Sequence, residues 1–579
     1  MKRITEPVNR RKVTALAVLF IFFVLFVKLV FVQVFMYSKI NKAVEKMVRR
    51  ENIEMPKRGD ILDAKGRVLA TSVRRYNLFI DPKIIADLND VRIKLASYGI
   101  KIKQKTLKEF GDTSYFPLAY NLDEEAVRKI KAEKIFGVGF ESKYIRQYPE
   151  GRLLAHILGI TGSDGGGLEG IEKICNVYLS GEQVKTRQYK DGRGKVIHDK
   201  FVDTTKIRGL DITLTIDKNI QFIAEQELRK AFSEYKAKKA ICIVQNPKNG
   251  AILAMVSLPD FDFSDKIKSA GVLRNAAISD IFEPGSTFKI VTVAAALNED
   301  KIKLTDTFYL ENGRMKIGRH TIRDDHKIAG YASLSKAMEQ SSNIGMVKIA
   351  QKTGSRDFYD YIRKFGFYSL TGIDLPGEAK GILLDEKNWN SLSLPTISFG
   401  QSVGVTAIQL INSFSAVANG GVLMKPIIIK NIENTLPENM SLFEPKEIRR
   451  VISAETADEV KRILRNVVDK GTGKSAKIPG YSVGGKTGTA QKIDTSTKKY
   501  STKYYVASFC GMLPAMEPEL VILVIIDEPK GDYYASSVAS PVFARIAERS
   551  AQYLNINKDD PENAKNDKIK QNESKKVKK

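Results

Sequence analysis

The chain of 579 residues is too long for one compact core, so we expect one large domain and one or two smaller ones. Its net charge of +26 favours an anionic partner. No helix-turn-helix, zinc-finger or aromatic RNA-binding pattern is present, which argues against nucleic acid as the partner. An anionic membrane environment explains the charge better. Three scattered cysteines and four histidines give the spacing of neither a disulfide framework nor a metal site.

The N-terminal segment predicts a membrane anchor. A basic tail, residues 1–12, precedes an almost unbroken apolar run at 13–36, and about 20 such residues span a bilayer. Lys28 lies inside this run and must snorkel or meet a polar partner. No small-residue cleavage site follows, so we favour an uncleaved anchor over a signal peptide. Basic residues flank both ends of the run, which leaves the orientation open.

The next unit, residues 37–205, is expected to stand above the membrane. Apolar residues at helical spacing from Ile40 to Val48 predict that the anchor continues as an amphipathic helix. Residues 58–70 predict a β-hairpin with its turn at 64–66. His156 lies on an apolar helix face, where a packed structural residue is more common than a ligand.

A second folded unit, residues 206–554, has the pattern of an α+β domain. The predicted strands are 240–244, 251–257, 482–492, 505–513 and 520–527; residues 286–466 are mainly helical, and a last helix covers 538–554. This order predicts one five-stranded antiparallel sheet flanked by helices. Residues 555–579 are polar and Lys-rich, which predicts a disordered tail.

A serine three residues before a lysine marks the candidate active site. Ser286 and Lys289 follow a Pro-Gly break and open an apolar helix, so both lie on one face of its first turn. A serine needs a base to act as a nucleophile, and burial at a helix N-terminus favours the neutral amine. The same spacing occurs at Ser233, Ser333 and Ser496, which we interpret as solvated or capping serines.

Two further motifs follow in the same unit. Ser341-Ser342-Asn343 ends a helical pattern, where helix capping is the simplest explanation. Lys486-Thr487-Gly488-Thr489 lies on a predicted strand, where an edge-strand lysine is the alternative. The three motifs together, in this order, are the set found in penicillin-binding proteins and class A β-lactamases.

The chain resembles a class B penicillin-binding protein, a monofunctional D,D-transpeptidase, over roughly residues 13–553. The segments that carry the resemblance, besides the three motifs, are 58–63 with Gly66, Arg146 with Tyr148 and Pro149, 167–170, 274–278, 283–289, and 398–401 with Thr406 and Gln409. The resemblance implies a membrane-anchored pedestal (dimerisation) domain and a transpeptidase domain. It places the N-terminus in the cytoplasm and the rest outside the inner membrane, on the periplasmic side.

The resemblance also implies a mechanism in which Lys289 deprotonates Ser286, which attacks the D-Ala-D-Ala bond of a peptidoglycan stem pentapeptide. Ser341 would relay the proton to the leaving group, Asn343 would hold the substrate amide, and Lys486 would supply positive potential. β-Lactams would acylate the same serine. No metal or organic cofactor is required.

The substrate is expected along the third motif. The resemblance implies that Thr487, Gly488 and Thr489 bind it, with the hydroxyls of the two threonines on its terminal carboxylate. Backbone N–H groups of Ser286 and Thr489 would form the oxyanion hole. The expected partners are a polytopic membrane glycosyltransferase and other division proteins, which would contact the anchor and the pedestal.

Other functions of the same residues are weaker alternatives. A β-lactamase would not need the anchor and pedestal, and no Glu-containing deacylation motif lies between Asn343 and Lys486. A penicillin-sensing receptor would need a signalling module, for which the 12 residues before the anchor leave no room. Within the family, residues 486–492 and 508–514 resemble the septal type more than the side-wall type. The absence of a wall-binding repeat after Leu554 argues against a sporulation-type variant.

Overall fold

The computed structural model describes residues 8–54, 56–102, 113–181, 184–190, 196–199, 208–267, 269–433, 444–494, 497 and 499–561. It divides into two compact units, Met1–Lys57 with Gly181–Arg208, and Arg58–Ser180 with Gly209–Lys579. The predicted boundary between residues 205 and 206 lies outside the described residues. Most of the predicted pedestal thus shares a compact unit with the catalytic domain.

The first unit contains the expected anchor helix. Within the described residues, the segment Arg10–Phe35 is the one helix long and apolar enough to cross a membrane. It is made of α1 (Val8–Val30) and a π-helical turn, η1 (Phe31–Phe35), and α2 (Tyr37–Val48) continues it as predicted. β1 (Arg49–Glu54), β6 (Val184–Lys190) and β7 (Val196–Asp199) form a three-stranded sheet in this unit.

A six-stranded sheet in the second unit contains the predicted hairpin, β2 and β3, and joins residues far apart in sequence. Its central order is β16-β8-β2-β3-β4, and β5 also pairs with β3. The elements of this part are β2 (Ile61–Leu62), β3 (Val68–Ile80), α3 (Leu88–Ala96), β4 (Phe116–Leu122), α4 (Glu124–Ala132), β5 (Val138–Gln147), α5 (Ala155–Leu158), α6 (Gly170–Ile174), α7 (Asn176–Leu179), β8 (Ile212–Leu214) and β16 (Ile429–Ile432). Because β8 pairs with β2, the chain before the catalytic domain is tied into it.

Two buried ionic clusters explain why residues 58–67 and 146–172 carry charge. Glu172 is fully buried and accepts hydrogen bonds at 2.6 Å from the Nε atoms of both Arg58 and Arg146. Two guanidinium groups around one carboxylate satisfy the buried charge, which would otherwise be costly. The Arg and Glu residues of these segments therefore hold β2, β5 and α6 together.

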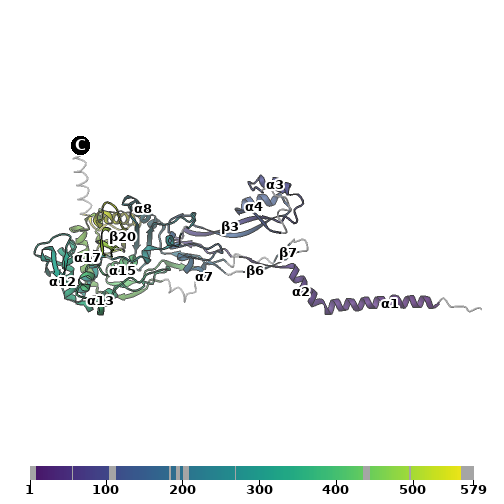
Figure 1. The fold of residues 1–579 in the computed structure, drawn as a ribbon, viewed down its shortest axis with the longest axis horizontal. Helices are drawn as coiled ribbons and strands as arrows, with labels where there is room; N and C mark the ends of the chain where they lie inside the picture. The colour runs from purple at the N-terminus through teal and green to yellow at the C-terminus, as the bar shows by residue number, and fades with distance from the viewer. Residues whose placement is uncertain are drawn as a thin grey trace, which may run out of the picture. The chain divides into compact units, whose positions relative to one another are not determined.

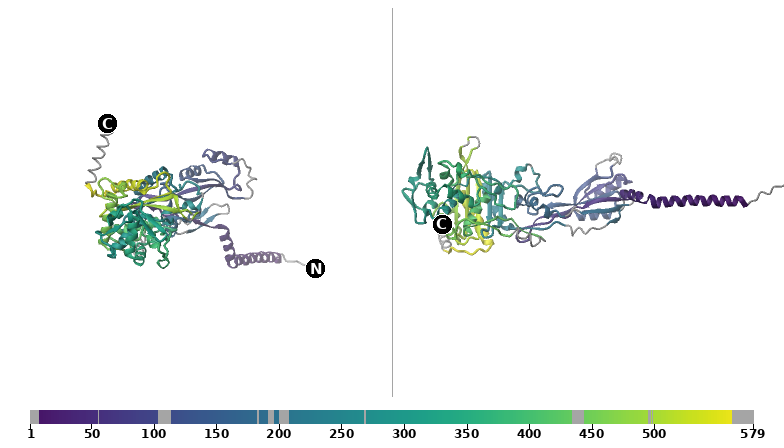
Figure 2. Two further views of the ribbon diagram at one scale, coloured as in Figure 1. Left: turned by 60° about the vertical axis from the view of Figure 1, so that its left-hand side comes forward. Right: turned by 90° about the horizontal axis from the view of Figure 1, so that it is seen from below.

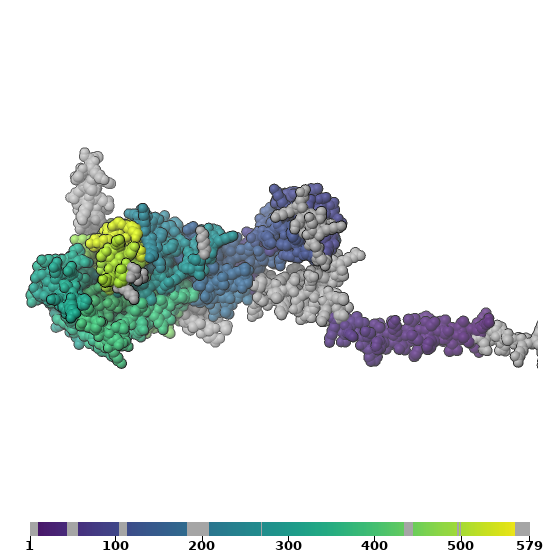
Figure 3. Space-filling view, viewed as in Figure 1, coloured from purple at the N-terminus to yellow at the C-terminus, as the bar shows by residue number. Residues whose placement is uncertain are grey.

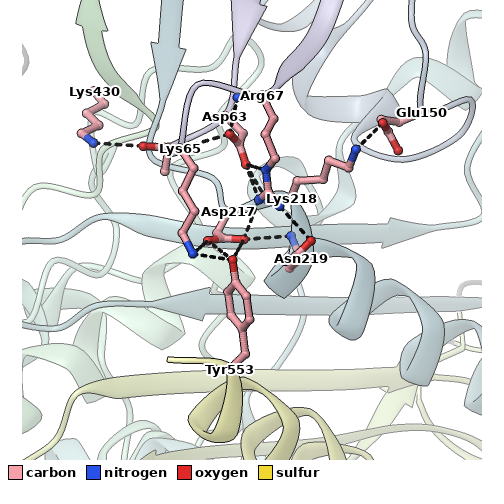
Figure 4. A network of polar contacts seen from close by, with 10 residues as sticks. Asp63, Lys65, Arg67, Glu150, Asp217, Lys218, Asn219, Lys430 and Tyr553 are labelled. Carbon is pink, nitrogen blue, oxygen red and sulfur yellow. Dashed lines mark hydrogen bonds and ion pairs between the residues drawn. The ribbon is translucent and has the colours of Figure 1, made fainter. Parts of the chain in front are cut away.

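The second cluster fixes the β2–β3 hairpin to α8 (Lys218–Glu234) and α19 (Ser540–Tyr553). Figure 4 shows the side chains converging from the three elements. Asp63 is buried and accepts from the Nε of Arg67 at 2.8 Å and from the backbone N–H of Lys218 at 3.1 Å. Asp217, the N-cap of α8, accepts from Arg67 at 3.0 Å and from the hydroxyl of Tyr553 at 2.9 Å.

The predicted five-stranded antiparallel sheet is confirmed, with the order β10-β9-β20-β19-β18. Its strands are β9 (Lys239–Gln245), β10 (Ile252–Leu258), β18 (Gly484–Ile493), β19 (Tyr500–Leu513) and β20 (Leu520–Asp527). One face packs on α8 and α19, and the other on a larger helical block. In Figure 1, α8 lies above β20 and α15 (Ala407–Ala418) below it. Figure 3 shows the yellow C-terminal segment against the teal surface of α8.

The middle of the chain is less helical than predicted. Figure 2 shows this block in teal and green from two further sides. Besides α15, its helices are α9 (Ala276–Ser279), α10 (Lys289–Asn298), α11 (Leu334–Glu339), α12 (Asn343–Thr353), α13 (Ser355–Lys364), α14 (Ser393–Ile397) and α17 (Ala454–Asp469). Short strands interrupt it: β11 (Thr307–Tyr309), β12 (Arg314–Ile317), β13 (His320–Arg323), β14 (Tyr331–Ser333), β15 (Val422–Met424) and β17 (Glu447–Arg450). Strands of three or four residues are too short to show a clear period of two.

The end of the fold also differs from the prediction. α18 (Ala535–Val538) precedes α19, and residues 555–561 pack on the domain instead of starting a disordered tail. Ile556 is only 6% exposed, and Asp559 accepts a hydrogen bond of 2.8 Å from the backbone N–H of Ser482. The hydroxyl of Tyr481 also donates to the carbonyl of Ile556 at 3.1 Å, so apolar and polar contacts together dock this segment. Residues 562–579 of the predicted tail lie outside the described residues.

Candidate active site

A tight turn, η5 (Gly285–Phe288), presents Ser286. This turn is a 3₁₀ helix, so the serine lies just before α10 and not inside its first α-helical turn as predicted. Gly285 has φ +54°, which glycine adopts without strain, and its N–H donates to the carbonyl of Gly400 at 3.0 Å. A Cβ on Gly400 would lie 2.1 Å from the carbonyl oxygen of Gly285. The backbone of residues 398–401 therefore packs closely against the turn that carries the half-buried serine.

Lys289 is the first residue of α10 and is fully buried. Its Nζ donates to three acceptors: the carbonyl of Ser341 at 2.5 Å, the hydroxyl of Ser341 at 3.1 Å and Oδ1 of Asn343 at 2.8 Å. Residues 289–297 are buried throughout, as the apolar pattern predicts. The helix α10 thus places the amine of Lys289 in a polar cluster at the edge of an apolar core.

The second motif divides between the site and a helix cap. Ser342 is fully buried and caps α12 by accepting from the N–H of Gly345 at 2.9 Å, so capping is the correct explanation for this residue. Ser341 has φ +56° between α11 and α12. Its hydroxyl accepts from Lys289 at 3.1 Å and from Lys486 at 3.0 Å. The structure thus brings the two lysines together on one oxygen.

Asp324 supports this motif and was not predicted. Its carboxylate accepts from the backbone N–H groups of Asn343 at 2.6 Å and Ile344 at 3.0 Å, and from the hydroxyl of Ser342 at 2.6 Å. A carboxylate is favourable at a helix N-terminus because the first N–H groups have no partner in the helix. Since 19 residues separate Asp324 from Asn343, no local spacing could have indicated it.

The third motif lies on β18, the outer strand of the five-stranded sheet. Lys486 is fully buried, and besides Ser341 its Nζ reaches the carbonyl of Thr487 at 3.2 Å. A Cβ on Gly488 would lie 2.7 Å from the Oγ of Ser508, so the strand approaches its neighbours as closely as only glycine allows. Thr489 accepts from the N–H of Ala535 at 3.1 Å.

Burial tunes both lysines. It lowers the pKa of Lys289 to about 7, although the carboxylates of Asp324 and Asp325 act to raise it. The pKa of Lys486 lies well below its ordinary value, first because of burial and second because of Lys289. We expected burial and the helix N-terminus to favour the neutral amine of Lys289, and burial is the main cause. Burial also disfavours the charge that we expected on Lys486, and a bound carboxylate would favour it again.

The other Ser-x-x-Lys segments lie outside this cluster. Ser333 caps α11 by accepting from the N–H of Lys336 at 3.2 Å, which confirms the capping interpretation. Ser233 is exposed near the end of α8, and Ser496 lies outside the described residues. In the part of the chain that the structure describes, no group of three His, Cys, Asp or Glu side chains could hold a metal ion.

Comparison with known proteins matches both halves of this architecture. The penicillin binding protein transpeptidase domain matches residues 240–548, and the penicillin-binding protein dimerisation domain matches residues 53–214. Stage V sporulation protein D of Bacillus subtilis is 35% identical, covering 93% of this chain and 84% of its own length. Peptidoglycan D,D-transpeptidase FtsI of Buchnera aphidicola is 32% identical, covering 96% and 97%. Penicillin binding protein 3 of Mycobacterium tuberculosis, solved with aztreonam, superposes with a TM-score of 0.68 at 27% identity, covering 88% of this chain and 99% of that one.

Proposed function

Because this chain belongs to the penicillin-binding proteins and is a peptidoglycan D,D-transpeptidase, we propose that it cross-links stem peptides of the septal wall during cell division. The observation that carries the catalytic part is the convergence of Lys289 and Lys486 on the Ser341 hydroxyl, at 3.1 and 3.0 Å, beside the turn that presents Ser286. A serine nucleophile needs a base, and the buried amine of Lys289, three residues further along the chain, is the candidate.

The acylation step uses the neutral form of Lys289. The amine takes the proton from Ser286, whose Oγ forms a bond to the carbonyl carbon of the penultimate D-Ala. The developing oxyanion is held by the backbone N–H groups of Ser286 and Thr489, and fixed donors of this kind stabilise charge without reorganisation. Ser341 is hydrogen-bonded to both lysines. It passes the proton from Lys289 to the departing nitrogen as the C–N bond breaks, and D-Ala leaves with a neutral amine.

Cross-linking reverses the proton movement. An amine of a second stem peptide attacks the ester carbonyl, a new C–N bond forms, and the C–O bond to Ser286 breaks. The attacking amine gives up one proton, which passes through Ser341 to Lys289, and Lys289 then returns a proton to the Oγ of Ser286. Asn343 accepts a hydrogen bond from Lys289 at 2.8 Å, so it orients this base, and its amide also suits the substrate backbone.

The substrate's terminal carboxylate would bind to Lys486 and to the hydroxyls of Thr487 and Thr489. Because Gly488 has no side chain, the backbone of β18 can lie directly against the turn that carries Ser286. β-Lactams would bind in the same way and acylate Ser286. Solved structures of penicillin binding protein 3 with aztreonam and with ampicillin support this extension.

A fluorescent penicillin tests the nucleophile. The wild type should retain the label after denaturation, whereas Ser286→Ala should not. Labelling that persists in the variant would refute the assignment. A β-lactamase is the competing activity, and it would release the label within the time of the assay instead of keeping it as a stable acyl-enzyme.

We also propose the domain limits and the topology. The limits are a cytoplasmic tail (1–12), an anchor (13–36), a pedestal (37–205), a transpeptidase domain (206–554) and a C-terminal tail. The family matches at residues 53–214 and 240–548 support a pedestal followed by a transpeptidase domain. The catalytic domain would lie outside the cytoplasmic membrane, since its substrate does. A polytopic glycosyltransferase would contact the anchor, where Lys28 needs a polar partner.

The septal assignment rests on residues 486–492 and 508–514, which resemble the septal type, and is supported by a relative named FtsI. Depletion should give filamentous cells, whereas round cells would indicate side-wall synthesis instead. The 35% identity to stage V sporulation protein D favours a second candidate, a role in spore formation. Normal division with defective spores after depletion would support that candidate.

A further inference from the structure

The β12–β13 hairpin presents a group of basic side chains beside the second motif. Arg314, Lys316 and Arg323 are exposed on its strands, and Arg319 is exposed in its turn. Successive residues of a strand point to opposite faces, so Arg323 points away from its neighbour Ile322, which packs in the core with 8% exposure. We call these four basic residues the basic hairpin surface.

The charges of this surface oppose the folding of the hairpin. Arg314 lies directly opposite Arg323 in the antiparallel register, and like charges in that position destabilise a sheet. A neighbouring lysine is neutralised, because Lys348 pairs with Glu311 at 2.7 Å. Among the residues that the structure describes, no carboxylate forms an ion pair with the basic hairpin surface. A bound anion would relieve the repulsion.

Hydrogen bonds join this hairpin to the catalytic cluster. The carbonyl of Arg323 accepts from the Nδ2 of Asn343 at 2.9 Å, and Asp324 accepts from the backbone N–H of Asn343 at 2.6 Å. Asn343 in turn accepts from the Nζ of Lys289 at 2.8 Å. Because the donor is proposed to lie along β18, a second stem peptide that approaches the ester on Ser286 from the second motif would pass the basic hairpin surface.

The acceptor of the cross-linking reaction carries the complementary charge. Its stem peptide contains the attacking amine and ends in a carboxylate, and a pentapeptide spans at most roughly 17 Å. The four residues of β13 extend over roughly 13 Å. A carboxylate of a peptide whose amine lies at the ester can therefore reach the hairpin. Arginine suits such a ligand, because its guanidinium group can bind a carboxylate through two hydrogen bonds.

We propose that the basic hairpin surface binds the acceptor strand during cross-linking, through the carboxylates of its stem peptide. The inference rests on the proposed transpeptidase function and adds the surface that recruits the second substrate. The four basic residues act in binding and take no part in proton transfer at Ser286. They should therefore affect transfer to an acceptor and leave acylation unchanged.

The test compares transfer with hydrolysis in the full-length protein. The donor is N-benzoyl-D-Ala thioglycolate, which esterifies Ser286 as its thiolate leaves. The acceptor is a disaccharide tetrapeptide from the cell wall of the source bacterium, which has lost the terminal D-Ala of a donor. Released thiol measures total turnover, and mass spectrometry measures the transfer product.

Reversing two charges at the outer end of the hairpin should weaken transfer. With Lys316→Glu and Arg319→Glu combined, the ratio of transfer to hydrolysis should fall about fivefold at an acceptor concentration below saturation, because exposed charge pairs are individually weak. Penicillin labelling and hydrolysis of the acyl-enzyme should match the wild type, since neither uses the acceptor.

Two matched variants make the test specific. Lys316→Arg combined with Arg319→Lys keeps both charges and should keep the ratio. Lys230→Glu combined with Lys248→Glu makes the same charge change at exposed positions on α8 and in the turn between β9 and β10, and should also keep the ratio.

Four results would overturn the inference. They are an unchanged ratio in the charge-reversal variant of the hairpin, an equal loss in the variant of Lys230 and Lys248, a parallel loss of penicillin labelling in the hairpin variant, and a wild type that labels but transfers nothing to this acceptor. A wild type that takes no label from penicillin would instead refute the proposed function.

Discussion

The pH dependence of acylation follows directly from the burial of Lys289. Its pKa of about 7 means that about half of the enzyme carries the neutral amine at pH 7. A lysine with the ordinary pKa would be neutral in roughly one molecule in 3000 at that pH. Burial therefore raises the reactive fraction by about three orders of magnitude. Between pH 6 and pH 8 the neutral fraction rises from about 9% to about 91%, or about tenfold.

The assay is the second-order rate of labelling by a fluorescent penicillin between pH 5.5 and 9. The sign is fixed by the chemistry: the base acts when neutral, so the rate should rise with pH through 7 and then level off. Lys289→Arg keeps a cation but cannot supply a neutral amine, so it should lose this rising limb together with most of the rate. A wild-type rate that is constant across this range, or that rises only near pH 10, would refute the role of Lys289.

Three further predictions concern neighbouring groups. Asp325→Asn removes a carboxylate that raises the pKa of Lys289, so the midpoint of the same pH profile should move to lower pH; a shift upward would contradict the electrostatic account. Gly488→Ala places a Cβ 2.7 Å from a hydroxyl of the next strand, and should lower stability by about 1–3 kcal/mol and slow penicillin labelling, with normal labelling as the contrary result. Tyr553→Phe removes a 2.9 Å hydrogen bond to Asp217, and should cost about 1 kcal/mol in denaturant unfolding while leaving labelling intact; lost labelling would mean that this joint also governs the active site.

The parts of the molecule that could be predicted from the sequence are those with a local apolar pattern of sufficient length. The five strands of the catalytic sheet are long and apolar, and the anchor exceeds the length of a bilayer span, so both stood out. The turn that carries Ser286 was predicted as part of a helix, because a 3₁₀ turn and an α-helical first turn share the same residues. The burial of the segment after it, and therefore the direction of the pKa of Lys289, followed from its apolar character.

Features set by contacts between distant segments could not be predicted. Asp324 reaches the helix that begins with Asn343 only in the folded chain, because the two residues lie 19 positions apart in the sequence. The β12–β13 hairpin, with Arg and Lys on an outer face, has neither the length nor the alternation of a typical strand. Such residues are found by asking which buried polar groups have partners, and that question requires coordinates.

The acyl-enzyme itself tests the central claim most directly. The wild type is incubated with a donor peptide ending in D-Ala-D-Ala, quenched in acid and digested, and the modified peptide is identified by mass spectrometry. The account predicts an ester on Ser286 whose mass is that of the donor less one D-Ala, with one D-Ala released per ester. An ester on Ser341, or release of D-Ala with no ester on Ser286, would contradict it.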